Sequence, residues 1–283
     1  MTKESVIIVG LGEVGRPLYE LLNGNPNFDV YGFDLNEKKM REIEQQKSDF
    51  PTKFNVMHVC IPCLDKTEFV NTVCSYVQRF NPKLVIINST VEPGATLEVY
   101  KHCGNCLVAH SPVRGVHKSE EYMKKELKRW TKYVGGATPE AADYAKKHFD
   151  LVGLKTKVLK SCVETELAKL FETTYRAWMI ACFQEMHRIS RHFGASFDDV
   201  VDFIEDTHRV RHDRPLMFPG VIGGHCQIPN IELLLKTYDS KFLKIILESN
   251  EKRKEEVKNR EITEEIEEIK KRVEANEKQV LAT

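Results

Sequence analysis

The sequence has no excess charge of either sign, since its 283 residues include 42 Lys and Arg residues and 42 Asp and Glu residues. Proteins that bind nucleic acid or anionic membranes through a basic surface carry an excess of Lys and Arg. The sequence also has no long hydrophobic run, because its apolar stretches are strand-length, too short to span a bilayer. We therefore expect neither a nucleic-acid partner nor a membrane span.

We also expect no signal peptide, because Met-Thr-Lys-Glu leads directly into a strand pattern. We expect a cytoplasmic protein whose eight cysteines are mostly reduced thiols. The pairs Cys60/Cys63 and Cys103/Cys106 have the C-x-x-C spacing of zinc ligands. However, Cys60 lies in an apolar run typical of a sheet strand, and the second pair precedes another strand. We therefore expect no bound metal.

The composition is that of a folded chain, with 41% hydrophobic and 9% aromatic residues. A chain of this length and composition can bury a sizeable core. It is long enough for one large domain or two modest ones, and it is not intrinsically disordered.

A glycine-rich turn follows the first strand pattern, at residues 5–9, and leads into a helical pattern at residues 16–22. The turn reads G-x-G-x-x-G in the context of strand, tight turn and helix that dinucleotide-binding folds require. Its first glycine permits the turn, the second lets a pyrophosphate approach the backbone, and the third lets helix and strand pack closely. The cofactor-binding residues predicted here are Gly10, Gly12, Glu13, Val14 and Gly15.

An acidic residue follows the second strand pattern, at residues 30–33, about 20 positions after the glycine turn. Asp34 would accept hydrogen bonds from both ribose hydroxyls of an adenosine and repel a 2′-phosphate. We therefore predict NAD as the cofactor, in preference to NADP.

Further strand patterns follow at residues 55–61, 84–88, 106–109 and 132–136, with helical patterns at 66–80, 94–101 and from 139. This alternation predicts a doubly wound parallel sheet of the Rossmann type. Ligands bind at the carboxyl edge of such sheets, so Pro62 and Thr90, which follow two of these strands, are predicted to face the cofactor. Thr90 has an equally good interpretation as a turn-forming residue before Pro93 and Gly94.

One long helix is predicted from Ser161 to about Phe193, because apolar residues recur at helical spacing and no Gly or Pro interrupts them. Ser161 and Glu164 form a capping-box pattern at its start. At about 1.5 Å per residue, such a helix is longer than one small domain requires. We therefore expect it to join two halves of the protein or two subunits. Lys169 lies early on this mainly apolar helix.

We therefore expect an α/β protein in three parts. Residues 1–160 form the NAD-binding domain, residues 161–250 a smaller all-helical domain that includes the long helix, and residues 251–283 a charged C-terminal helix. A thin apolar stripe in this last helix, including Ile266, Ile269 and Val273, is compatible with a solvated helix or with a coiled-coil seam.

A loop between residues 217 and 230 contains three glycines and two prolines around His225 and Cys226, a composition that predicts irregular structure. A loop with so many conformational constraints commonly positions a functional group. Cys226 is therefore a candidate nucleophile, because a neighbouring imidazolium or helix N-terminus favours the thiolate. The alternative is a small buried thiol in a tight loop.

Taken together, these segments resemble the nucleotide-sugar 6-dehydrogenase family, the UDP-glucose/GDP-mannose dehydrogenase type. Four segments carry the resemblance, in the family's order and over residues 4–250: the glycine turn with Arg16-Pro17-Leu18, Ser89-Thr90-Val91-Glu92-Pro93-Gly94, the helix around Lys169, and Pro219 to Cys226. The resemblance covers no third domain, so we expect the family's C-terminal nucleotide-sugar-binding domain to be lacking.

The resemblance implies an NAD-dependent oxidation of a sugar alcohol, in four electrons when complete. It implies Cys226 as the nucleophile that attacks an aldehyde intermediate, Lys169 as the cation that stabilises the oxygen anion, and Thr90 as a ligand of water or substrate. Thr173 and Asn230 occupy family site positions, where an asparagine and an aspartate are usual. The family also implies a homodimer, with central helices of two subunits packed together.

Three departures leave other functions open. Val113 stands where the family has a glutamate after Ser-Pro, and Asn230 and Thr173 replace the two residues named above. The core architecture also resembles β-hydroxyacid dehydrogenases, in which Arg114 would clamp a substrate carboxylate and Cys226 would be incidental. A third possibility is a catalytically degenerate NAD-binding module that needs a partner.

Overall fold

The computed structural model describes residues 3–43, 50–104, 106–115, 119–224 and 226–282. The chain divides into two compact units, Met1–Leu170 and Phe171–Thr283. The division falls inside the long helix α7 (Cys162–His192). The bounds of α7 confirm the predicted helix to within one residue at each end. No helix in these described ranges combines the length and the hydrophobicity needed to cross a membrane.

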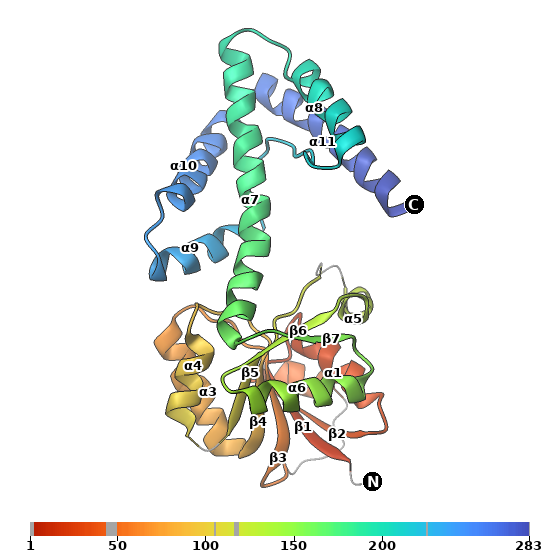
Figure 1. The fold of residues 1–283 in the computed structure, drawn as a ribbon, viewed down its shortest axis with the longest axis vertical. Coiled ribbons are helices and arrows are strands. Elements are labelled where there is room, and N and C mark those ends of the chain that lie inside the picture. Colours follow the sequence, from red (N-terminus) through yellow and green to blue (C-terminus); the bar gives the residue numbers. More distant parts are fainter. Residues whose placement is uncertain (1–2, 44–49, 105, 116–118, 225, 283) are drawn as a thin grey trace. The chain divides into compact units, whose positions relative to one another are not determined.

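The first unit is built on a seven-stranded sheet with helices on both faces (Figure 1). Its strand order is β2-β1-β3-β4-β5-β6-β7. The strands are β1 (Glu4–Val9), β2 (Phe28–Phe33), β3 (Phe54–Val59), β4 (Pro82–Ile87), β5 (Leu107–His110), β6 (Lys132–Gly136) and β7 (Thr156–Val158). The helices are α1 (Gly15–Asn23), α2 (Glu37–Glu42), α3 (Lys66–Phe80), α4 (Ala95–Cys103), α5 (Glu120–Arg129) and α6 (Pro139–Val152).

The predicted α/β fold is confirmed, and the sheet is mostly parallel. Strands β1 to β5 pair in parallel, whereas β6 runs antiparallel to β5. The predicted parallel sheet therefore contains one antiparallel pairing, that of β5 with β6. Since β1 lies between β2 and β3, the chain reverses its direction of winding there, and the crevice for a ligand lies at the carboxyl ends of these strands.

Successive side chains of a strand point to opposite faces of the sheet, so they belong alternately to two separate hydrophobic clusters. Val6 and Ile8 of β1 face the cluster under α1, α5 and α6. Ile7 and Val9 face the cluster under α3 and α4. Helices thus cover both faces of the sheet, and its carboxyl edge is left for the loops that carry the candidate site.

Two cysteines of the first unit form a disulfide. Cys74 of α3 and Cys103 at the end of α4 are bonded, with their Cα atoms 5.4 Å apart. The other six cysteines are not disulfide-bonded: Cys60, Cys63, Cys106, Cys162, Cys182 and Cys226. Within the described residues, no group of three or more possible ligands could hold a metal ion.

The second unit is all-helical. Besides the later part of α7, it contains α8 (Phe197–Arg211), α9 (Gln227–Thr237), α10 (Lys241–Glu256) and α11 (Arg260–Ala282). Ile266, Ile269 and Val273 of α11 are buried, the last two in the core of this unit. The apolar stripe expected on the charged C-terminal segment therefore packs within the same chain, and the segment after residue 250 comprises the end of α10 and all of α11.

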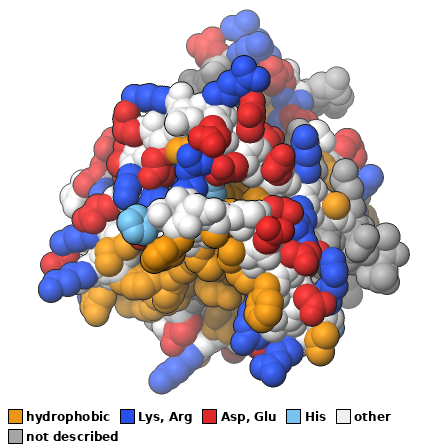
Figure 2. Space-filling model, turned by 90° about the horizontal axis from the view of Figure 1, so that it is seen from above, with side chains coloured by type: hydrophobic (Ala, Val, Ile, Leu, Met, Phe, Trp, Pro, Cys, Tyr) orange, Lys and Arg blue, Asp and Glu red, His pale blue; other side chains and the backbone are white. Residues whose placement is uncertain are grey.

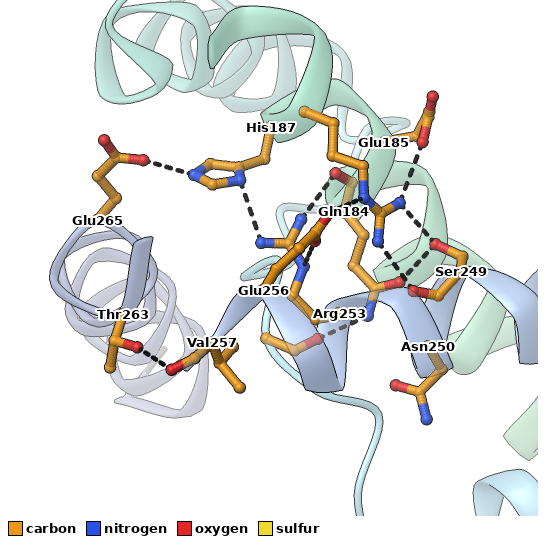
Figure 3. A network of polar contacts seen from close by, with 12 residues as sticks. Gln184, Glu185, His187, Ser249, Asn250, Arg253, Glu256, Val257, Thr263 and Glu265 are labelled. Carbon is orange, nitrogen blue, oxygen red and sulfur yellow. Dashed lines mark hydrogen bonds and ion pairs between the residues drawn. The ribbon is translucent and has the colours of Figure 1, made fainter. Parts of the chain in front are cut away.

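A polar network ties three of these helices together (Figure 3). The fully buried guanidinium of Arg253 on α10 donates to the carbonyl oxygen of Gln184, at 2.9 Å, and contacts His187 Nδ1, at 3.1 Å, both on α7. Because arginine only donates, His187 Nδ1 accepts, which leaves the Nε2 hydrogen for Glu265 of α11, at 2.7 Å. A buried arginine paired in this way specifies how α7, α10 and α11 pack.

Candidate active site

The glycine turn after β1 has the geometry that its sequence predicts. Gly10 adopts φ +89°, where an L side chain is strained. A Cβ on Gly15 would lie 1.7 Å from the carbonyl oxygen of Gly10, so only glycine lets α1 begin so close to the turn. By contrast, a Cβ on Gly12 would meet nothing nearer than Lys39 Nζ, at 4.0 Å. The protein therefore leaves open space in front of Gly12.

Asp34 lies at the end of β2, beside the same turn. Its carboxylate accepts hydrogen bonds from the backbone N–H of Leu11, at 2.7 Å, and of Asn36, at 2.8 Å. Lys39 Nζ lies 3.5 Å from the same carboxylate. Burial opposes ionisation, but these hydrogen bonds and the lysine charge outweigh it and hold the pKa of Asp34 below its ordinary value. Asp34 is thus an ionised acceptor with lone pairs to spare.

A cavity of about 420 Å³ opens at the carboxyl ends of β1, β2 and β3. Four of the predicted cofactor residues line it: Gly10, Gly12, Asp34 and Pro62. One face of α3, with Phe69, Thr72 and Tyr76, also lines the cavity, and sequence reasoning missed these three residues. Their spacing of three and four on the correctly predicted helix was the available signal. Glu13 and Val14 lie outside it, Glu13 lining an adjacent cavity and Val14 preceding α1.

Thr90 is half-buried in the segment that follows β4. Two hydrogen bonds hold the preceding Ser89: its hydroxyl donates to the carbonyl oxygen of Ile61, at 2.6 Å, and its own carbonyl oxygen contacts His110 Nε2, at 3.0 Å. Burial, with the nearby charges of Lys132 and Lys169, lowers the pKa of His110 to about 3. The neutral ring therefore donates to Ser89, and the position of Thr90 is set by this framework.

Glu166, near the start of α7, anchors the other end of that segment. Its fully buried carboxylate accepts the backbone N–H of Gly94, at 2.7 Å, and of Thr96, at 2.9 Å. Burial raises its pKa, although these hydrogen bonds oppose the shift. A carboxylate at this point satisfies free N–H groups at the start of α4. The sequence pointed to Lys169 on this helix and missed Glu166, whose signal was a charge on a mainly apolar helix.

Lys169 is half-buried on the part of α7 that belongs to the first unit. Its charge lowers the pKa of Lys132 and of His110, which places it in the electrostatic surroundings of the segments after β4 and β5. The structure thus associates Lys169 with the same sheet edge as Thr90.

The other three candidates belong to the second unit. Asn230 donates from Nδ2 to Thr173 Oγ1, at 2.7 Å, which joins α9 to α7. Its backbone N–H donates to the carbonyl oxygen of Cys226, at 3.1 Å. Cys226 is half-buried and precedes the first residue of α9, so it lies at a helix N-terminus, and His225 lies outside the described residues. The structure therefore brings Thr173, Cys226 and Asn230 together.

The predicted irregular loop ends earlier than expected. Helix α9 begins at Gln227, so residues 227–230 are helical and the expectation of irregular structure there is wrong. Pro229 is compatible with this because a proline in the first helical turn removes no hydrogen bond.

The segment after β5 contains Val113, at the position where the resembled family has a glutamate. Val113 is buried in the hydrophobic cluster under α1, α5 and α6. Arg114 donates to the carbonyl oxygen of Thr131, at 2.8 Å, and its Cζ lies 5.1 Å from the ring centroids of both Trp130 and Tyr133. Val113 therefore contributes packing here, and Arg114 holds the segment to the chain before β6.

Comparison with known proteins gives a family match in the second half of the chain. Residues 163–252 match the model of the UDP-glucose/GDP-mannose dehydrogenase family, central domain. The chain is 27% identical to the UDP-N-acetyl-D-mannosamine dehydrogenase of Methanocaldococcus jannaschii, with 87% of this chain and 65% of that protein aligned. It is 23% identical to the UDP-glucose 6-dehydrogenase of Campylobacter jejuni, with 88% and 72% aligned. The chain thus spans 65% of the length of the first of these curated relatives.

Solved structures share the fold. The UDP-D-ManNAc dehydrogenase of Pyrococcus horikoshii superimposes with a TM-score of 0.72 at 23% identity, covering 88% of this chain and 68% of that one. A 3-hydroxyisobutyrate dehydrogenase of Mycobacterium tuberculosis gives a TM-score of 0.66 at 17% identity and covers 87% and 92%. At these identities the likeness is one of fold, a Rossmann-type domain followed by helices.

Proposed function

The chain belongs to the UDP-glucose/GDP-mannose dehydrogenase family through its central domain, residues 163–252, and from this premise we propose that it is an NAD-dependent oxidoreductase. Its substrate is the alcohol group of a sugar, in nucleotide-linked form, as the names of its curated relatives suggest. One observation carries the proposal: Cys226, at the N-terminus of α9, is joined through Asn230 to Thr173 within the matched region.

The residues of the first cavity fit a dinucleotide. Open space in front of Gly12 would admit a pyrophosphate, and the N-terminus of α1 would stabilise its charge. The ionised Asp34 would accept the ribose hydroxyls and repel a 2′-phosphate, which favours NAD over NADP. NAD, when bound, accepts a hydride from the alcohol carbon.

Cys226 supplies the nucleophile in this proposal. A thiol at a helix N-terminus is in a position that stabilises the thiolate. The thiolate attacks the carbonyl carbon of the aldehyde formed in the first oxidation, forming a C–S bond. Loss of a second hydride, to a second NAD, leaves a thioester, which water hydrolyses to the carboxylate and the free thiol. Lys169 stabilises the oxygen anion that develops during each oxidation.

Asn230 and Thr173 have a different role in this proposal. An amide or a threonine hydroxyl cannot act as a base near neutral pH, so neither activates water. Their mutual hydrogen bond holds the start of α9, and with it Cys226, against α7. Val113 does not supply the missing base either, because its side chain is aliphatic and has no proton-accepting group. We therefore expect thioester hydrolysis to be the slow step, or the reaction to stop at the aldehyde.

The test is NADH formation, followed by absorbance, with the purified chain, NAD and a panel of UDP- and GDP-sugars. Two NADH per sugar consumed would support the full route through Cys226, and one would support an oxidation that stops at the aldehyde. Small hydroxy acids belong in the same panel, because turnover only with them would favour a β-hydroxyacid dehydrogenase. NAD binding without turnover of any substrate would favour a degenerate module.

We further propose that the second unit forms a homodimer through α7. Hydrophobic side chains gather over one area of the surface (Figure 2). In the second unit, α7 exposes apolar residues at spacings of four, three and eleven, which all fall on one helix face: Phe171, Tyr175, Trp178 and Ile189. Trp178 extends this face by packing on Phe242 of α10, with ring centroids 4.0 Å apart. The same face of a second copy would cover these exposed residues of α7.

Replacing two residues of this apolar face of α7 should dissociate the dimer. We expect the double variant Tyr175→Glu/Trp178→Glu to sediment as a monomer at micromolar concentration, because two buried carboxylates per subunit would oppose association. Phe203→Glu is the matched control, since Phe203 is 79% exposed but belongs to α8. A wild-type chain that is already monomeric at that concentration would contradict the proposal.

A further inference from the structure

A buried lysine lies beneath the carboxyl edge of the sheet. Lys132, the first residue of β6, is only 5% exposed. Its Nζ donates to the carbonyl oxygens of Ser111, at 2.8 Å, and Pro112, at 3.2 Å, and to Asn88 Oδ1, at 3.4 Å. Asn88 directly follows β4, and the other two acceptors directly follow β5. A single ammonium therefore connects the chain segments that leave two neighbouring strands.

A chain of hydrogen bonds continues from Asn88 through the core to the opposite edge of the sheet. Asn88 Nδ2 lies 3.0 Å from His58 Nδ1, and His58 Nε2 lies 2.9 Å from His148 Nε2. His148 Nδ1 in turn lies 2.5 Å from Glu4 Oε2. Both imidazoles are fully buried, so each of their nitrogens needs a partner of the right kind.

The proton positions in this chain follow from its two ends. The Glu4 carboxylate only accepts, so His148 Nδ1 carries a hydrogen and, in the neutral ring, Nε2 accepts from His58. His58 Nδ1 is then an acceptor for the Asn88 amide, which leaves Asn88 Oδ1 facing Lys132. Burial, with the charge of Lys132, holds the pKa of His58 well below its ordinary value, in agreement with a neutral ring. In each of these hydrogen bonds the donor therefore lies on the side of Lys132 and the acceptor on the side of Glu4.

We propose that Lys132 is a positioning residue, whose ammonium sets the geometry of the segments after β4 and β5 that receive the reacting half of the dinucleotide. Ser89 and Thr90 follow Asn88 directly, and His110, which holds Ser89, directly precedes Ser111. Ligands of such sheets bind outside these strand ends. The inference rests on the proposed function, since it requires that a dinucleotide occupies this edge.

The inference implies a dependence on pH. Burial lowers the pKa of Lys132 to about 7; Cys60 opposes this shift, while the charges of Lys169 and Arg114 add to it. Other titratable groups that face Lys132, directly or through Asn88, come from β1, β3, β5 and α6: Glu4, His58, His110 and His148. As the pH rises through 7, Lys132 loses a proton and with it one of three donors. At least one of its three acceptors then loses its hydrogen bond.

The test compares the binding of NAD with that of ADP-ribose, which lacks the nicotinamide, by calorimetric titration. We expect Lys132→Met to weaken NAD binding about tenfold while leaving ADP-ribose affinity nearly unchanged. Lys157→Met is the matched control, because Lys157 pairs in register with Tyr133 on the neighbouring strand but is exposed. In the wild-type chain, NAD affinity should fall between pH 6 and pH 8.5 and ADP-ribose affinity should not, whereas Lys132→Arg should remove this pH dependence.

Equal losses for both ligands in Lys132→Met, or no loss for either, would overturn the inference. The pH series on the wild-type chain tests it even if the variants do not fold, since a constant ratio of the two affinities would also overturn it. A wild-type chain that binds neither ligand would overturn the proposed function, and the inference with it. If the wild-type protein binds NAD and ADP-ribose but the ratio of the two affinities does not change with pH, the inference is overturned and the proposed function is not.

Discussion

Cys226→Ser should reduce NADH formation by roughly a hundredfold or more, or limit it to one NADH per sugar, because a serine hydroxyl is a far weaker nucleophile than a thiolate near neutral pH. The change replaces one sulfur atom by oxygen and preserves the shape of the side chain at the N-terminus of α9. If the variant still completes the first oxidation, free aldehyde should accumulate. The measurement is the rate of NADH formation together with the yield per sugar consumed.

Cys182→Ser is the control for general effects of thiol loss, since Cys182 is a free and exposed cysteine of the same unit. It should retain the wild-type rate. Activity on small hydroxy acids that survives Cys226→Ser but not Lys169→Met would select the β-hydroxyacid dehydrogenase interpretation. An undiminished rate and a yield of two NADH in Cys226→Ser would refute the thiol mechanism.

Gly12→Ala and Gly15→Ala should separate cofactor binding from folding, although both glycines belong to one turn. A Cβ at Gly12 meets no protein atom closer than 4.0 Å, so the ligand-free stability should change by less than about 1 kcal/mol. The same methyl group would occupy the space that a pyrophosphate needs, and NAD affinity should fall by about a hundredfold. Calorimetric titration with NAD and thermal unfolding without it measure the two effects.

Gly15→Ala should have the opposite profile. Its Cβ would lie 1.7 Å from the carbonyl oxygen of Gly10, and relieving that clash requires the turn or α1 to move, at a cost of about 3 kcal/mol or more. The ligand-free chain should therefore unfold at a lower temperature. A Gly15→Ala chain as stable as the wild type would contradict the geometry of the turn, and wild-type NAD affinity in Gly12→Ala would contradict the placement of the pyrophosphate.

Local signals were sufficient where a segment depends only on its own residues. Helix α3 and strand β6 have the predicted bounds, and in α3 Asp65 caps the first turn while Asn81 ends the helix in a left-handed conformation. Both are short-range effects that a sequence displays directly. The glycine turn and Asp34 were predictable for the same reason, because strand, turn and acid follow one another along the chain.

The start of α9 and the disulfide were not predictable in this way. Glycines and prolines around Cys226 indicated irregular structure, but whether a proline breaks a helix depends on its position within the first turn. Cys74 and Cys103 are 29 residues apart on two helices, and no local pattern assigned them to each other. Their bond depends on the packing of α3 against α4, which is a tertiary property.

The sequence by itself determined the glycine turn, the acid that follows it and the long helix, and it singled out Cys226 as a candidate nucleophile. Only the tertiary structure decided which polar groups meet in the core. Lys132 reaches Asn88 across 44 positions of sequence, Asn88 meets His58 across 30, and His148 meets Glu4 across 144. Such contacts depend on the order and register of the strands. That order is set by packing over the whole unit, which no single segment encodes.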